Sequence, residues 1–72
     1  MERQLLRVNP GDRIAVLTAF GERLNRRAVS GVEKGHKFPV VWACREDEWE
    51  AAQKQGRQPD ATPWPVTDVT RL

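Results

Sequence analysis

Residues 38–64 read FPVVWACREDEWEAAQKQGRQPDATPW, and this stretch decides the fold of the 72-residue chain. It passes directly from a strand-like apolar run into a helix-like acidic run, and it contains all three tryptophans. Each large aromatic side chain buries roughly 150–250 Å² when it packs into a core. We therefore expect Trp42 to lie in a core strand, Trp49 to dock the helix and Trp64 to close the core.

The apolar run, residues 38–44, carries the strongest strand signal in the chain. Its two alternating faces are both apolar, which is typical of a strand inside a barrel or sandwich, so Phe38 is expected in the core. The acidic run, residues 46–55, predicts a helix. Its first residues are acidic and suit the positive end of the helix dipole, and Gly56 suits the position after the last turn.

Turn signals divide the rest of the chain into short segments. Asn9-Pro10-Gly11-Asp12 is a strong turn sequence, a loop around Gly21 predicts a hairpin, and Gly31 indicates a bulge or bend. The proline-rich residues 57–65 are expected to run extended over the surface. In all, we expect strands over residues 13–18, 24–32, 38–44 and 69–72, a helix over residues 46–55, and a frayed N-terminal arm or short first strand over residues 1–8.

These elements predict a mainly β fold in one domain spanning residues 1–72. Short strands separated by regular turns favour a small antiparallel barrel or sandwich, with the helix plugging one end or covering one edge. The segment PGDRIAVL, residues 10–17, resembles the first strand of SH3-like barrels, in which a Gly-Asp turn starts an alternating strand. The predicted fold is therefore a small antiparallel SH3-like barrel with one helix.

A second resemblance covers residues 40–69, VVWACREDEWEAAQKQGRQPDATPWPVTDV. This run is similar to the C-terminal half of small uncharacterised proteins of actinobacteria and their phages. Those proteins combine a V-x-V-C-like strand, an acidic E-E-W-E-A-A helix, a G-R-x-P step and a W-P-x-x-D-V ending. The resemblance implies an architecture and an actinobacterial or phage setting, and it implies no activity.

Composition excludes several classes of protein. No apolar run approaches the roughly 20 residues of a membrane helix, and the N-terminal sequence lacks the apolar core of a signal peptide, so we expect a cytoplasmic protein without membrane contact. Cys44 and His36 are the only cysteine and histidine of the chain. A disulfide within the chain, a structural metal site and a bound cofactor are therefore not expected.

Charge is unevenly distributed along the chain. Up to Arg45 there are nine Lys/Arg and four Asp/Glu, which gives +5, whereas from Glu46 onward there are three and six, which gives −3. Such a chain either presents a basic surface to phosphates or joins its halves by salt bridges. If residues 24–32 and 38–44 form a hairpin, the candidate contact residues gather along it and its loop: Arg23, Arg26, Arg27, Lys34, His36 and Lys37.

Three other features have a structural and a functional interpretation. Cys44 is either a nucleophile or, as we favour, a small buried apolar residue. The acidic cluster at residues 46–50 has a sufficient explanation in the helix dipole, so acid–base catalysis is not favoured. Trp64, between two prolines, is a candidate partner anchor, although packing over the barrel is the favoured interpretation.

Together these observations predict a non-enzymatic binding or adaptor module. The alternative is a nucleic-acid-binding regulator that uses the basic hairpin on phosphates. A thiol enzyme using Cys44 is the third and least favoured hypothesis. The partner is expected to be a protein or a nucleic acid, and the sequence predicts no particular oligomeric state.

Overall fold

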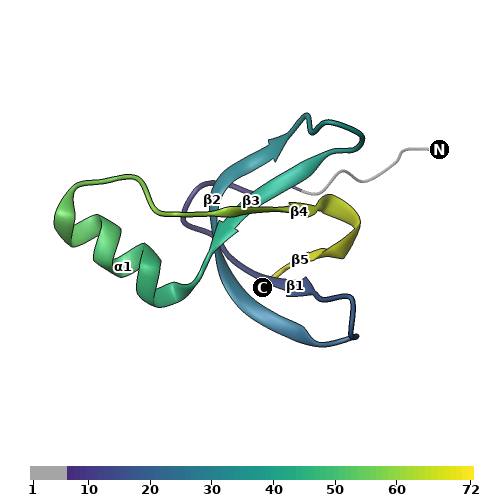
Figure 1. The fold of residues 1–72 in the computed structure, drawn as a ribbon, viewed down its shortest axis with the longest axis horizontal. Coiled ribbons are helices and arrows are strands. Elements are labelled where there is room, and N and C mark those ends of the chain that lie inside the picture. The colour runs from purple at the N-terminus through teal and green to yellow at the C-terminus, as the bar shows by residue number, and fades with distance from the viewer. Residues whose placement is uncertain (1–6) are drawn as a thin grey trace.

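The computed structural model of the protein describes residues 7–72, and Figure 1 shows its ribbon. Five strands pair antiparallel in one sheet of order β4-β3-β2-β1-β5, with β4 and β5 at its two edges. Over these described residues the fold is therefore mainly β with one α-helix, as predicted. The elements are β1 (Arg13–Leu17), β2 (Arg23–Glu33), β3 (Val40–Cys44), α1 (Glu46–Gln55), β4 (Thr62–Pro65), the 3-10 helix η1 (Val66–Asp68) and β5 (Val69–Arg71).

The turn before β1 forms as its sequence predicts. Gly11 has φ +93°, in the region that favours glycine, and the Asp12 N–H donates to the Asn9 carbonyl at 3.0 Å. The next hairpin also follows its sequence. Gly21 has φ +83°, and the Thr18 hydroxyl accepts the N–H groups of residues 20 and 22, so β1 ends at Leu17 and Thr18 begins the loop.

The long strand β2 serves both halves of the sheet. Its first half pairs with β1 and its second half with β3, and the register shifts between Ala28 and Val32. Gly31 lies in this irregularity, which confirms the predicted bulge. A Cβ at Gly31 would lie 2.8 Å from the carbonyl oxygen of Val8, so only glycine lets that backbone approach. Val8 in turn is buried in the core, whereas residues 1–6 of the expected N-terminal arm lie outside the described residues.

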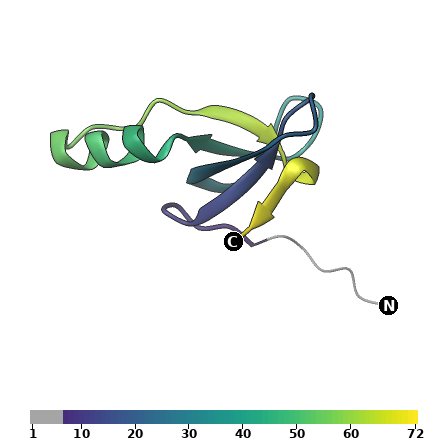
Figure 2. The same cartoon turned by 90° about the horizontal axis from the view of Figure 1, so that it is seen from below.

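The core lies on one face of this bent sheet. Figure 2 shows β1 and β5 side by side in the sheet. Leu24, Trp64 and Val66 are partly buried and pack against the core. The last strand runs beside β1, and the Leu72 N–H donates to the Arg13 carbonyl one residue beyond its end. The buried cluster consists of Val8, Ile14, Val16, Ala28, Val41, Ala43 and Val69.

Strand β4 was not expected, because its residues were predicted to cross the surface without pairing. Instead β4 pairs with β3, with Pro63 opposite Trp42 and Pro65 opposite Val40. Proline has no N–H for a sheet ladder and is therefore confined to edge strands. The two prolines fit here because β4 is an edge.

Helix α1 has the predicted bounds and the predicted end. Gly56 adopts φ +65°, and the N–H groups of Gly56 and Arg57 donate to the carbonyls of Gln53 and Ala52, which is a Schellman motif. The helix projects beyond the end of β3 instead of lying across the sheet (Figures 1 and 2). Ala52 is fully buried and the Trp49 ring lies against Gly11, so Trp49 docks the helix as expected.

Trp42 lies in β3, as predicted, but its side chain is exposed instead of buried. The prediction that Phe38 lies in the core was wrong, because its side chain is exposed as well. Val41 and Ala43 point into the core, so Trp42, between them, points to the opposite face of β3. The segment that follows α1 borders this face, because residues 58–61 line a hollow together with Trp42, whereas α1 itself extends past the end of the strand. Phe38 lies in the loop before β3, which begins only at Val40.

Among the described residues, the structure contains no helix with the length and apolar character needed to cross a membrane.

Candidate binding surface

The predicted basic hairpin exists, but it does not bring its six basic residues together. Lys34, His36 and Lys37 lie exposed in the connection between β2 and β3. Arg23 is the first residue of β2, beside Leu17 of β1, and therefore lies at the other end of this long strand. Arg23 is thus separated from the three basic residues of the loop by the length of β2.

Arg26 and Arg27 are half-buried and differ from the loop cations. Arg26 Nη1 donates to the Asn25 carbonyl at 2.8 Å, and its side chain borders a hollow beside Cys44. Arg27 contacts three groups at once. Its Nε and Nη2 lie 3.1 and 3.0 Å from the two carboxylate oxygens of Glu46, and its Nη1 donates to the Gly11 carbonyl at 2.9 Å.

The guanidinium of Arg27 also lies over the Trp49 ring, with its Cζ 5.8 Å from the ring centroid. These contacts join the turn before β1, strand β2 and helix α1. They also join the basic and acidic halves of the chain, as one of the two interpretations of its charge asymmetry expected. Arg27 therefore has a structural role at the junction of these three elements.

The basic residues of the loop meet two exposed aromatic rings, those of Phe38 and Trp42. A hollow of about 450 Å³ is lined by both groups of side chains, and Gly35, Val40 and Pro63 complete its lining. Among the described residues, those that line this hollow include no aspartate or glutamate. We call the following set the aromatic–basic surface: Lys34, His36, Lys37, Phe38, Trp42 and Pro63.

Two local devices hold this surface in place. A Cβ at Gly35 would overlap the carbonyl oxygen of Phe38, so the loop can close this tightly only with glycine at that position. At the β2 bulge the hydroxyl of Ser30 accepts the backbone N–H of Trp42 at 3.2 Å. Ser30 thus replaces the ladder partner that the register shift removes, and it fixes the backbone that carries the Trp42 ring.

Sequence reasoning found the cations of this surface and missed its rings. The alternation of side chains along residues 38–44 correctly assigned them to two faces of a strand. Because both faces are apolar, we expected both to be buried, and the exposed rings of Phe38 and Trp42 were missed. The available signal was the length of the helix: about three turns cannot cover both the Cys44 end and the Phe38 end of the same strand face.

Cys44 is buried at the end of β3, where α1 begins. Burial raises the pKa of its thiol, and the nearby carboxylates of Glu48 and Glu46 raise it further, while Arg27 acts in the opposite direction. His36, the single histidine, lies before β3, at the opposite end of the strand from Cys44. These features disfavour the thiolate that nucleophilic chemistry requires.

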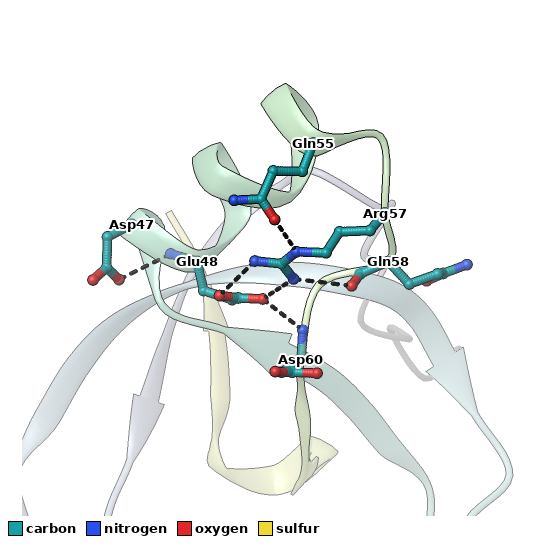
Figure 3. A network of polar contacts seen from close by, with 6 residues as sticks. All are labelled: Asp47, Glu48, Gln55, Arg57, Gln58 and Asp60. Carbon is teal, nitrogen blue, oxygen red and sulfur yellow. Dashed lines mark hydrogen bonds and ion pairs between the residues drawn. The ribbon is translucent and has the colours of Figure 1, made fainter.

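The acidic cluster of α1 is engaged in structural contacts, and Figure 3 shows the larger of its networks. Glu48 accepts from Arg57 Nη1 at 2.6 Å and from the Asp60 backbone N–H at 2.9 Å. Arg57 also donates to Gln55 Oε1 and to the Gln58 carbonyl. Glu48 therefore ties the helix to the segment that leads into β4.

This network predicts a pH effect on stability. The hydrogen bonds from Arg57 and from the Asp60 N–H lower the pKa of Glu48 from 4.5 to about 2. A carboxylate whose pKa is lower in the folded state stabilises the fold above its ordinary pKa, and this contribution is lost as the pH falls through the folded value. Glu48→Gln should therefore lower the urea midpoint at pH 7, and the difference from wild type should shrink between about pH 4.5 and pH 2.

Glu50→Gln is the matched control, since Glu50 is an exposed glutamate on the same helix. Its urea midpoint should follow that of the wild type across this pH range. A Glu48→Gln difference that stays constant down to pH 2 would show that the charge of Glu48 is not what stabilises the helix connection.

Trp64 packs against the core cluster, as the favoured of its two interpretations expects. Among the described residues, no group of three or more His, Cys, Asp or Glu side chains is placed to hold a metal ion. Comparison of the chain with protein-family models, with curated proteins and with solved structures gave no match. The feature of the described residues that points to a function is therefore the aromatic–basic surface.

Proposed function

We propose that the protein is a small non-enzymatic binding module that binds an anionic partner through the aromatic–basic surface. One observation carries this proposal: Phe38 and Trp42 are 51% and 37% exposed and share a hollow with Lys34 and Lys37. Single exposed apolar residues are common on protein surfaces and need no functional explanation. A group of exposed aromatic rings beside several positive charges instead favours recognition of a partner. The partner would offer negative charge to the lysines and a flat or apolar group to the rings.

The strand arrangement supports an SH3-like barrel as the scaffold of this module. The first strand pairs with the last, the long second strand bends to serve both halves of the sheet, and a 3-10 helix lies between β4 and β5. Partly open SH3-like barrels share this plan. The proposed compartment is the cytoplasm, where the single Cys44 would remain a thiol.

A thiol enzyme is the weakest of the three hypotheses. Its nucleophile would be a buried cysteine whose pKa is raised, and its only histidine lies at the other end of β3. The binding-module proposal instead assigns Cys44 to packing at the junction of β3 and α1.

The test is an NMR titration of ¹⁵N-labelled protein with heparin, a polyanion without bases, at two salt concentrations. Amide shifts should concentrate in residues 34–42, and binding should weaken as salt is added, because phosphate-like contacts release counterions. Lys34→Ala/Lys37→Ala should weaken binding at least about tenfold, since it removes two charge contacts of about 1 kcal/mol each.

Arg13→Ala/Arg23→Ala removes the same charge from exposed positions outside the surface and is the matched control. Its affinity for heparin should stay within about threefold of wild type, as expected for distant, screened charges. Equal weakening in the two double variants would mean that net charge, and not this surface, governs binding, and the proposal would then fail.

A further inference from the structure

We propose that the anionic partner of the aromatic–basic surface is a single-stranded nucleic acid. Its bases stack on Phe38 and Trp42, while Lys34 and Lys37 contact its phosphates. This inference rests on the proposed function and names the partner class of the same surface.

The rings of Phe38 and Trp42 are placed where the bases of a single strand could stack on them. Trp42 lies on the outer face of β3 with Pro63 opposite it on β4, and Phe38 lies just before the same strand. Both rings line one hollow, so a flat ligand group can contact one of them without displacing core side chains. Aromatic rings on an open β-surface beside cations are the stacking platform that single-strand-binding proteins use, because every base has a π-face.

Charge complementarity also favours a nucleic-acid strand. Lys34, His36 and Lys37 line the hollow together with the rings, whereas the neighbouring carboxylates of Glu33 and Asp60 line a separate hollow that Trp42 also borders. A phosphate chain would therefore be attracted to one side of the Trp42 ring and repelled from the other. This separation of positive and negative charge around Trp42 defines the path of a bound nucleic-acid strand across the surface.

The alternation of rings and cations favours a single strand over other anions. In a duplex the base faces are stacked on one another, so Phe38 and Trp42 would find no π-face to contact. An acidic peptide would satisfy Lys34 and Lys37 and would leave the rings without a flat partner. A single strand offers a phosphate and a base in every residue, which matches both kinds of side chain.

Two contacts shape the surface without a ligand. Gly35 permits the close approach of the backbone in the loop, and the Ser30 hydroxyl accepts the backbone N–H of Trp42. Contacts that form before binding lower the entropic cost of binding.

The experiment compares four labelled probes by fluorescence anisotropy at one fixed salt concentration. They are a twelve-nucleotide oligothymidylate, an abasic phosphodiester strand of the same length, a twelve-base-pair duplex and a polyglutamate peptide. Stacking is worth roughly 5- to 150-fold in affinity for each base, so the oligothymidylate should bind at least about tenfold more tightly than the abasic strand. The duplex should bind no more tightly than the abasic strand.

Variants then locate the stacking. Trp42→Ala and Phe38→Ala should each reduce affinity for the oligothymidylate about tenfold while leaving affinity for the abasic strand unchanged. Phe20→Ala is the matched control, because Phe20 is a 91% exposed phenylalanine in the β1–β2 loop, outside this surface. It should leave binding of both strands unchanged, and circular dichroism should show each variant folded.

Two results would overturn this inference while leaving the proposed function intact. One is equal affinity for the oligothymidylate and the abasic strand, with both lost in Lys34→Ala/Lys37→Ala. The other is tighter binding of a polyglutamate peptide than of the oligothymidylate, which would assign the surface to an acidic peptide. Absence of binding to every polyanion, heparin included, would instead overturn the proposed function itself.

Discussion

Ile14→Ala is expected to lower the free energy of unfolding by about 2–5 kcal/mol, the usual cost of removing a buried isoleucine side chain and leaving a cavity. Ile14 lies on β1 between β2 and β5, and it is one of three large side chains that are fully buried among residues 7–72. Domains of this length bury little surface and have total stabilities near the low end of roughly 5–15 kcal/mol. The variant should therefore lose most of its stability.

Urea unfolding followed by tryptophan fluorescence measures this effect. Leu17→Ala removes a side chain of the same size from the same strand, but Leu17 is 40% exposed, so the urea midpoint should fall much less. Equal losses in the two variants would contradict the placement of the core on the Ile14 face of β1.

Local signals predicted the parts of the fold that local interactions determine. Helix α1 has its expected bounds because its acidic first turn and Gly56 act within a few residues of each end. The turn before β1 likewise has a local cause in the sequence of residues 9–12, to which Arg27 and Trp49 add contacts at Gly11. Such elements can be predicted from sequence because their physical causes lie inside the segment.

The remaining features depend on residues that are distant in the sequence. Trp42 is exposed on the face of β3 opposite the core, and no pattern within residues 38–44 encodes which segments cover that face. Strand β4 exists because an unpaired edge of β3 accepts its prolines. The proline-rich composition of residues 57–65 therefore predicted a connection without a strand, whereas residues 62–65 pair with the edge of β3.

The candidate surface was predicted only in part for the same reason. Lys34, His36 and Lys37 are neighbours in sequence and stay together in the loop. Arg23 is distant from them because β2 is long, and the partner of Arg27 lies 19 residues away on another element. A cluster of cations along a sequence thus predicts a surface only where the chain between them is short.

Arg27→Met is expected to lower the free energy of unfolding by about 2 kcal/mol, although methionine retains much of the apolar stem. The change removes one hydrogen bond and one ion-pair contact to Glu46, the hydrogen bond to the Gly11 carbonyl and the contact with the Trp49 ring. Breaking a fully buried pair costs about 3–5 kcal/mol. The cost here should be smaller because the side chains are 19% and 45% exposed.

Arg26→Met is the control for Arg27→Met, since Arg26 is a half-buried neighbour on the same strand whose guanidinium donates to the adjacent Asn25 carbonyl. Urea midpoints should fall clearly only for Arg27→Met. A double-mutant cycle with Glu46→Gln should give a coupling free energy of about 1 kcal/mol or more, because the two side chains are in contact. Zero coupling would contradict the structural role of the pair.

This result also decides how a binding defect in Arg27 variants is understood. If Arg27 joins the turn, β2 and α1, its replacement reduces the folded population and weakens every ligand to the same extent, with or without bases. Lys34→Ala should instead leave the urea midpoint unchanged and weaken only anionic ligands, because Lys34 is exposed in the loop. If Arg27→Met keeps the stability of the wild type but loses oligothymidylate binding, Arg27 contacts the ligand directly and belongs to the binding surface.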